Sequence, residues 1–199
     1  MQRIVLASSN RGKLAEFNKL LADGPFEVIP QAELGVEDAE ETGLTFVENA
    51  LLKARHASQV TGLPALADDS GLCVSHLRGA PGLYSARYSG GHGNAQANNA
   101  RLLRELDGVL PEQRGAFFIC VLALLWHAED PAPLIAEGRW HGHVLDAPRG
   151  ERGFGYDPLF LPHGQSQSAA ELDHEVKNRL SHRGQAMGTL HTRIAELHA

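Results

Sequence analysis

Two short acidic segments carry the side chains of this sequence that are most able to bind a metal ion. Glu40-Glu41-Thr42-Gly43 stands just before an expected helix, and Asp68-Asp69-Ser70-Gly71 follows an apolar run. Acidic residues before a helix are often only complements of the helix dipole, and Asp-Asp-Ser-Gly is often only a turn. The functional alternative is a magnesium site, because Mg²⁺ takes few protein carboxylates and completes its shell with water and substrate phosphates.

A polar turn near the start of the chain is a candidate phosphate site. Ser8-Ser9-Asn10-Arg11-Gly12-Lys13 lies between the apolar run 3–7 and a helical pattern that begins at Leu14. Backbone amides at such a strand-to-helix turn favour an anion, and phosphate is the usual one. The spacing is not that of a Walker A loop, so an ordinary connecting turn remains an alternative.

Further cations stand where a cation is unexpected. Lys53 falls in the middle of an apolar stripe, where it is either a long side chain that reaches out to solvent or a cation that faces an anion. The rest of that stripe consists of Phe46, Ala50, Ala57 and Val60. His182 and Arg183 open the last expected helix, where positive charge opposes the helix dipole, so an oxygen-rich ligand would relieve the conflict.

The elements that must position these residues alternate between strands and helices. Thr45 and Glu48 form a capping box at the start of a helix that runs to about Thr61. Residues 63–77 are predicted to form two short strands, interrupted by a turn at 68–71. Helices are also expected from Leu14 to near residues 23–25, over 95–107 and from an N-cap at Ser181, and strands over 3–7, 27–30, 115–127 and 134–145. The residues with helical spacing in the last helix are Ala186, Leu190, Ile194 and Leu197.

The composition excludes several classes of protein. The chain has 199 residues, of which 43% are hydrophobic and 21% charged, and a formal net charge of -6. These values are typical of a globular protein, and the acidic balance argues against a nucleic acid polymer as partner. The longest apolar stretch, 116–126, is about half of what a bilayer requires, and the first residues do not resemble a signal peptide. Cys73 and Cys120 are expected to be buried free thiols, so we predict a cytoplasmic protein with no membrane partner.

Six motifs follow one another along the chain: Ser8-x-Asn10-x-x-Lys13, residues 41–54 (ETGLTFVENALLKA), 66–72 (LADDSGL), 79–87 (GAPGLYSAR), 153–158 (GFGYDP) and 181–184 (SHRG). In kind and order they resemble the inosine triphosphate pyrophosphatase family, in its bacterial form that hydrolyses non-standard purine nucleoside triphosphates. The family usually has Thr-Gly-Asn where this chain has Ser8-Ser9-Asn10, so this chain keeps a hydroxyl at position 8 and lacks the glycine at position 9.

The resemblance implies an α/β fold with an elongated mixed β-sheet flanked by helices. It implies two lobes with a central substrate cleft, which together form one domain over residues 1–199, and usually a homodimer. The implied reaction is hydrolysis of ITP, dITP or XTP to the nucleoside monophosphate and pyrophosphate. Mg²⁺ is the implied cofactor, and the implied role is to cleanse the nucleotide pool.

The resemblance also assigns roles to particular residues. Asp69 would be the general base and a metal ligand, Glu41 a second ligand, and Asp68 a further candidate ligand. The triphosphate would be bound by Ser8, Ser9, Asn10, Arg11, Gly12, Lys13 and Lys53, with Ser70 as another substrate contact. The nucleoside would be bound by Phe154, Gly155, Tyr156, Asp157, Lys177, His182 and Arg183.

These roles agree with the chemistry of the residue types. The neighbouring charge of Asp68 is expected to raise the proton affinity of Asp69, which suits a base that deprotonates water. Hypoxanthine and xanthine present a 6-oxo acceptor where adenine presents an amino donor. Donors from His182 and Arg183 would therefore favour the oxo-purines, because adenine would leave those donors unpaired.

Two other functions remain open on the sequence. One is a related Maf-like pyrophosphatase that acts on other nucleotides. The motifs at 154–157 and 181–183 argue against this alternative. The other is a nucleotide sensor that binds without turnover. Both acidic segments are complete here, whereas a chain that had lost its activity could also have lost them.

Overall fold

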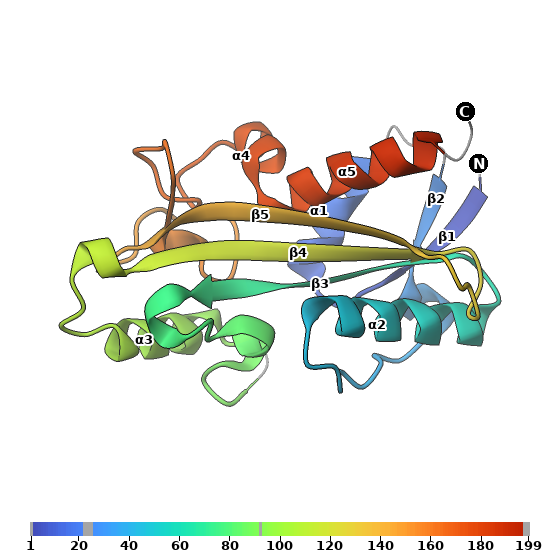
Figure 1. Cartoon of the computed structure of the whole chain (residues 1–199), viewed down its shortest axis with the longest axis horizontal. Coiled ribbons are helices and arrows are strands. Elements are labelled where there is room, and N and C mark those ends of the chain that lie inside the picture. Colours follow the sequence, from blue (N-terminus) through green and yellow to red (C-terminus); the bar gives the residue numbers. More distant parts are fainter. Residues whose placement is uncertain (1, 22–25, 92, 197–199) are drawn as a thin grey trace. The chain divides into compact units, whose positions relative to one another are not determined.

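The fold is described from a computed structural model that covers residues 2–21, 26–91 and 93–196, except the side chains of Arg11 and Leu20 (Figure 1). The strands are β1 (Gln2–Ala7), β2 (Phe26–Pro30), β3 (Ala65–Val74), β4 (Gly115–Leu125), β5 (Leu134–Val144) and β6 (Phe160–Pro162). The helices are α1 (Arg11–Leu21), α2 (Phe46–Thr61), α3 (Ala95–Glu105), α4 (His174–Leu180) and α5 (His182–Glu196). Short 3-10 helices lie between them, at 31–34, 75–77, 82–87, 111–113 and 157–159.

The strands form one mixed sheet in the order β2-β1-β3-β4-β5-β6. β1 pairs in parallel with both β2 and β3, whereas β5 and β6 are antiparallel. A parallel pair needs a crossover, and α1 and α2 supply the crossovers after β1 and β2. The predicted α/β fold with a mixed sheet is confirmed. Within the described residues, no helix is long and apolar enough to cross a membrane.

The chain divides into two compact units. The first unit comprises residues 1–69, 120–138 and 183–199, and the second comprises 70–119 and 139–182. The boundaries fall within β3, β4 and β5 and after the first residue of α5, so each of these elements contributes residues to both units. The substrate cleft and the single domain over 1–199 that the sequence suggested stay predictions.

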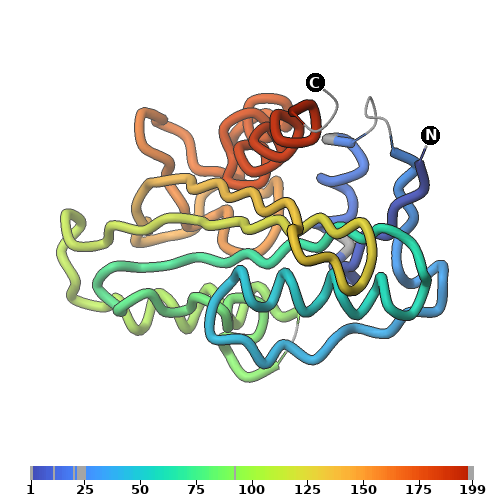
Figure 2. The backbone as a smooth tube through the Cα atoms, turned by 45° about the vertical axis from the view of Figure 1, so that its right-hand side comes forward, coloured from blue at the N-terminus to red at the C-terminus, as the bar shows by residue number. Residues whose placement is uncertain are grey.

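In the first unit, helices cover both faces of the strands. Buried side chains of α1 and α5 pack with alternate strand residues such as Ile4, Leu6 and Leu66 in one apolar core. Successive strand residues point to opposite faces. Figures 1 and 2 show α2 on the other side of the strands from α5. Small residues, Ala50, Ala54 and Ala57, form the buried face of α2 and allow a close approach.

The second unit has its own apolar core. Residues of β3, α3, β4 and β5 meet there with the segment around Tyr156 to Phe160. Phe160 packs edge-on against Phe118 at a ring distance of 4.7 Å and also contacts Trp140. This core therefore anchors the glycine-flanked loop 153–157 to the sheet, because Tyr156 belongs to both.

The expected capping box begins α2. Thr45 Oγ1 accepts from Glu48 N, and Glu48 Oε2 accepts from Leu44 N and from Thr45 Oγ1. The predicted apolar stripe is only partly correct, since Val60 is 56% exposed while Ala54 is fully buried. The buried face is therefore rotated away from Val60, towards Asn49 and Ala54.

One sequence prediction of secondary structure is wrong, and one helix was missed. β3 continues without a break from Ala65 to Val74, so residues 68–71 form no turn between two strands. Buried carboxylates can lie within a strand when cations pair with them on the faces of the sheet, which composition alone does not show. Helix α4 was not predicted, because its seven residues are too few to show an apolar period. Leu197 lies outside the described residues.

Gly142 is required by the close approach of β5 and β6. An added Cβ would overlap the Leu161 carbonyl oxygen and lie 2.8 Å from Phe160 Cζ. We expect Gly142→Ala to destabilise the protein by about 1–3 kcal/mol, measured as the free energy of unfolding in urea. Gly115→Ala is the control, since an added Cβ there meets only Ser75 Oγ at 4.0 Å. Equal stabilities of the two variants would contradict the prediction.

Candidate active site

The adjacent carboxylates Asp68 and Asp69 lie on opposite faces of β3. Both are buried, with 1% and 6% of their surface exposed. Asp68 contacts side chains from α1 and α5, and Asp69 contacts side chains from α2. This follows from the alternation of side chains along a strand, because the two sets of helices cover different faces. All of these contacts lie within the first unit.

Asp68 is held by cations from two helices. Lys13 Nζ lies 3.1 Å from Asp68 Oδ1, and Arg183 Nη2 lies 3.4 Å from Asp68 Oδ2. The guanidinium of Arg183 also pairs with Glu16, and Arg183 Cζ lies 5.5 Å from the centre of the Phe17 ring. Arg183 is 1% exposed. Its role as a nucleoside contact stays a prediction, and its observed partners are carboxylates of the first unit.

Asp69 shares one cation with Glu41. Lys53 Nζ lies 2.8 Å from Asp69 Oδ1 and 2.9 Å from Glu41 Oε1. Of the two alternatives for Lys53, the structure supports the cation that faces anions, since only 14% of its side chain is exposed. The contact joins the segment before α2 to the middle of β3, so the two acidic segments of the sequence meet at Lys53.

The two carboxyl groups have opposite pKa shifts. Burial raises the pKa of Asp69 above its ordinary value, and Lys53 only partly opposes this. Burial alone would also raise the pKa of Asp68, but Lys13 and Arg183 outweigh it and hold that pKa well below its usual range. The predicted direction for Asp69 is therefore confirmed, but its predicted cause is wrong. Burial is the main cause and Glu41 is the like charge, because Asp68 points to the other face.

The turn between β1 and α1 binds its own backbone amides. Asn10 Oδ1 accepts from Gly12 N at 3.0 Å and from Lys13 N at 3.1 Å, and Ser8 Oγ accepts from Asn10 N. Ser9 Oγ donates to Asp38 at 2.6 Å. Asn10 thus acts as the N-cap of α1, and two amides expected to attract phosphate already have a partner. Lys13 is a cation that this turn presents beside Asp68, whereas the side chain of Arg11 lies outside the described part of the chain.

In the second unit, Asp157 organises the predicted nucleoside loop. Asp157 Oδ2 accepts from Phe154 N at 2.8 Å and from Lys177 Nζ at 2.7 Å. Lys177 Nζ lies 5.2 Å from the centre of the half-exposed Phe154 ring. Tyr156 Oη donates to Ser85 O, and Asn99 Nδ2 donates to Gly155 O. Four residues of the predicted loop and Lys177 are therefore brought together.

The remaining predicted contacts are buried or half-buried. His182 is 7% exposed and stacks on Phe118 with a ring distance of 4.9 Å. Ser70 is half-buried in β3. His182 and Ser70 belong to the second unit, whereas Asp69 and Arg183 belong to the first. The phosphate and metal candidates thus lie in the first unit together with the nucleoside candidate Arg183, and the other nucleoside candidates lie in the second unit with Ser70.

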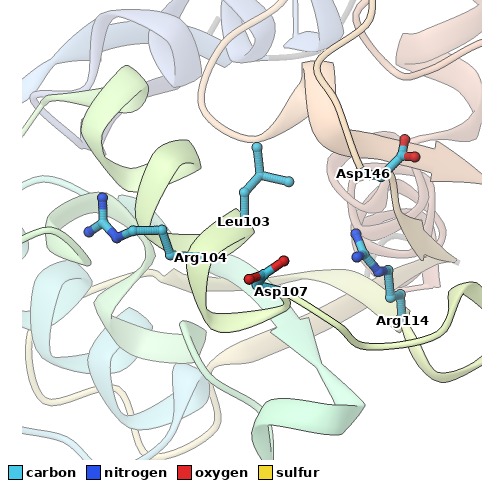
Figure 3. A pocket seen from close by; sticks show the side chains of 5 residues that line it. All are labelled: Leu103, Arg104, Asp107, Arg114 and Asp146. Carbon is cyan, nitrogen blue, oxygen red and sulfur yellow. The ribbon is translucent and has the colours of Figure 1, made fainter.

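A hollow of about 590 Å³ in the second unit involves none of the predicted site residues (Figure 3). Its lining consists of Leu103, Arg104, Asp107, Arg114 and Asp146. Arg114 donates from Nε, Nη1 and Nη2 to three backbone carbonyls, so its guanidinium stabilises the surrounding loops. The hollow therefore offers no site for the chemistry expected of the motifs.

Comparison with known proteins decides the family. A model of the Ham1 family matches residues 4–193. The chain belongs to the Ham1 family. The predicted resemblance to inosine triphosphate pyrophosphatases is thereby confirmed. The chain is 58% identical over 197 residues to a protein of Xanthomonas campestris named dITP/XTP pyrophosphatase, and the match covers 99% of each chain. A protein of the same name from Ralstonia nicotianae is 59% identical, over 98% of this chain and 97% of that protein.

Solved Ham1 structures share the fold. A Ham1 protein from Coxiella burnetii is 50% identical with a TM-score of 0.91, and the match covers 98% of this chain and 100% of that one. A structure described as a nucleoside-triphosphatase and dITP/XTP pyrophosphatase, from Mycobacterium abscessus, is 44% identical with a TM-score of 0.77. That match covers 95% of this chain and 98% of the other.

Glu41 and Asp69 of this Ham1 protein fit a metal ion such as Mg²⁺, which keeps some of its coordination positions for oxygens of the substrate. Glu41 and Asp69 already place oxygens around one positive group, the ammonium of Lys53. Within the described residues, no group of three or more His, Cys, Asp or Glu side chains could hold a metal by itself. Mg²⁺ does not need such a group, because it is usually bound through one or two carboxylates together with substrate phosphates.

The sequence analysis missed two residues that lie around Asp68 and Asp69. Glu16 pairs with Arg183, and Asn49 contacts Asp69. A usable signal was helical spacing, because Glu16 lies three residues after Lys13 and Asn49 four residues before Lys53. Residues at these separations share a helix face. Asn49 therefore faces Asp69 as Lys53 does, and Glu16 faces Arg183, the second cation beside the Asp68 that Lys13 contacts.

Both cysteines of the protein are buried free thiols, as predicted. Burial raises the pKa of Cys73 to about 11 and that of Cys120 to about 12. We expect neither thiol to react with a thiolate-specific reagent at pH 8, because both stay protonated and covered. Both should react once the protein is unfolded in urea. Rapid labelling of the native protein at Cys120 would contradict this result.

Proposed function

We propose that this chain hydrolyses the non-standard purine nucleoside triphosphates ITP, dITP and XTP to the nucleoside monophosphate and pyrophosphate, with Mg²⁺ as cofactor. It is thus proposed as a hydrolase acting on phosphoric anhydrides. Family membership and the names of relatives that are 58% and 59% identical support this activity. Such a reaction would cleanse the nucleotide pool.

The observation that carries the proposal is the arrangement of Asp69. A buried carboxylate of raised pKa lies beside a second carboxylate, Glu41, with a cation between them. Asp69 would take the proton of the attacking water, and its raised pKa suits a base that must also release that proton. Glu41 and Asp69 would hold Mg²⁺, which supplies positive charge for the triphosphate and the leaving pyrophosphate. Asp68 is a less suitable ligand, since cations occupy both its oxygens.

The other assigned residues of the first unit would bind the phosphates. Lys13 and Lys53 supply positive charge in a chain whose net charge is -6. The rest of this set consists of Ser8, Ser9, Asn10, Arg11 and Gly12 in the turn before and at the start of α1. Ser70 is proposed as a further substrate contact.

The residues proposed to bind the nucleoside offer a ring and several donors. Phe154 presents a half-exposed ring, and exposed rings on loops commonly stack on bases. Asp157 and Lys177 would hold that loop in place. The 2.7 Å contact between them and the hydrogen bond from the Phe154 amide to Asp157 support this role. Gly155, Tyr156, His182 and Arg183 complete the proposed set, and donors from His182 and Arg183 would favour a 6-oxo group over an amino group.

One assay tests the proposed activity. The purified protein is incubated with Mg²⁺ and, in turn, with ITP, dITP, XTP, ATP, GTP and TTP, while monophosphate and pyrophosphate are measured. We expect both products from the first three substrates and much slower release from the others. Orthophosphate as the sole phosphate product, or a preference for TTP, would reject the proposal. Binding of ITP without any product would indicate the nucleotide sensor instead.

We further propose a cytoplasmic homodimer that binds neither membranes nor nucleic acid polymers. The two free buried cysteines support a reducing compartment, and the acidic net charge argues against a polyanionic partner. The family resemblance supports the dimer. Light scattering of the purified protein should give twice the 21.5 kDa mass of the chain, and a monomer would reject the proposed assembly.

A further inference from the structure

Asn49 is a buried polar residue of α2 to which the roles proposed above assign nothing. It is 2% exposed and lies one helical turn before Lys53. Asn49 Oδ1 accepts a hydrogen bond from Gly43 N at 2.8 Å. Asn49 Nδ2 donates to Asp69 Oδ2 at 3.4 Å. One side chain therefore contacts both acidic segments within the first unit.

The partners of Asn49 determine the orientation of its amide. The backbone N–H of Gly43 can only donate, so the atom that faces it must be the carbonyl oxygen of Asn49. The amide nitrogen then faces Asp69, whose ionised carboxylate can only accept. The reverse orientation would oppose donor to donor and acceptor to acceptor. The bond to Gly43 therefore fixes which atom Asn49 presents to Asp69.

Gly43 allows this contact because it has no side chain. A Cβ at this position would lie 2.6 Å from Glu48 Cβ and 2.7 Å from Asn49 Oδ1. The backbone at residue 43 thus packs directly against the first turn of α2. Glu41 is only two residues away, so the hydrogen bond to Asn49 also restrains the segment that carries Glu41.

Asn49 and Lys53 hold Asp69 from the same helix face. Lys53 binds Asp69 Oδ1 and Glu41, whereas Asn49 faces Asp69 Oδ2 and binds Gly43. Lys53 has a flexible stem and a rotatable ammonium, so its contact alone does not fix the orientation of the Asp69 carboxylate. The planar amide of Asn49 is already fixed by Gly43, so it can orient the plane of the carboxylate.

We propose that Asn49 is a positioning residue, which orients the Asp69 carboxylate and holds the Glu41 segment at a fixed distance from it. This inference rests on the proposed function, in which Asp69 activates water. A misplaced catalytic group lowers the rate of the chemical step more than it lowers substrate binding, because the substrate is bound mainly by other groups.

Two substitutions at position 49 separate the effect on Asp69 from the effect on Gly43. Asn49→Asp keeps the size and the acceptor for Gly43 but turns an oxygen towards Asp69. Asn49→Ala removes both contacts and adds no charge. We expect each variant to lower kcat for ITP by about 10- to 100-fold, with KM changed by less than about threefold. The control is Ala57→Gly, a buried residue two turns further along α2, which lowers helix stability but touches neither acidic segment.

Hydrogen exchange at the Gly43 amide gives a readout that needs no activity. The amide should exchange slowly in the wild type, in Asn49→Asp and in Ala57→Gly, and at least about tenfold faster in Asn49→Ala, since only that variant loses the acceptor. Values of kcat within twofold of the Ala57→Gly control in both Asn49 variants, or unchanged exchange in Asn49→Ala, would overturn the inference. A wild type that hydrolyses none of the triphosphates would reject the proposed function and with it the catalytic role of Asn49, whereas fast Gly43 exchange in the wild type would reject the positioning contact alone.

Discussion

Asp69→Asn is expected to lower kcat for ITP hydrolysis by about 10²- to 10⁴-fold, which is the contribution typical of a general base. Asparagine has the same shape, but it cannot take a proton from water and is a weaker ligand for Mg²⁺. Lys13 and Lys53 remain, so binding of ITP should stay measurable by calorimetry in the absence of turnover. Near-normal kcat in this variant would exclude Asp69 as the base.

The same variant should not be less stable than the wild type. Burial raises the pKa of Asp69, so the folded protein holds this carboxyl proton more tightly than the unfolded chain does. The ionised form therefore costs stability at neutral pH, and a neutral asparagine removes that cost. Asp130→Asn is a matched control. Asp130 is buried and accepts from Trp126 N and Ala132 N, so its replacement should lower the melting temperature and leave kcat unchanged.

Arg183→Met is expected to destabilise the protein by about 3–5 kcal/mol, measured as the free energy of unfolding in urea at pH 7. The guanidinium is 1% exposed and pairs with both Glu16 and Asp68. Its removal leaves Asp68, which is fully buried, with Lys13 as its remaining salt-bridge partner and the Cys120 thiol as a weak donor at 4.0 Å. The loss is costly because methionine has no donor that could replace the guanidinium beside the buried oxygen Oδ2 of Asp68.

Two further measurements show whether this loss comes from the ion pairs. Arg193→Met on the exposed face of α5 is the control and should change stability by less than about 0.5 kcal/mol. The double variant Asp68→Asn with Arg183→Met should lose less stability than the sum of the two single variants, since each removes the partner that the other requires. Additive losses, or an Arg183 variant as stable as the Arg193 control, would contradict the role of these pairs.

Asp68 and Asp69 are expected to have different roles, Asp68 in stability and Asp69 in catalysis. Asp68 is held ionised between Lys13 and Arg183, so we expect it to maintain the fold around α1 and α5. Asp69 is destabilised as an anion and lies beside Glu41, so it is the better base. Substitutions on the two faces of β3 should therefore differ in which property they change.

The sequence by itself determined the elements that depend on local patterns. The capping box at Thr45 and Glu48, the helix that it begins, and the long strands β4 and β5 follow from residue spacing and turn residues over short distances. The motifs also determined the family, because six of them occur in the expected order along the chain. Helix α4 escaped prediction, since seven residues show too little periodicity.

Only the tertiary structure decided how the charged residues pair. The four residues Asp68-Asp69-Ser70-Gly71 have the local composition of a turn, yet they continue a strand because helices on both faces supply cations to the buried carboxylates. One partner of Arg183 is Glu16, which lies near the other end of the chain. The contact of Asn49 with Asp69 likewise depends on how α2 packs against β3. Pairings over such distances arise from packing, and no local pattern of residue types specifies them.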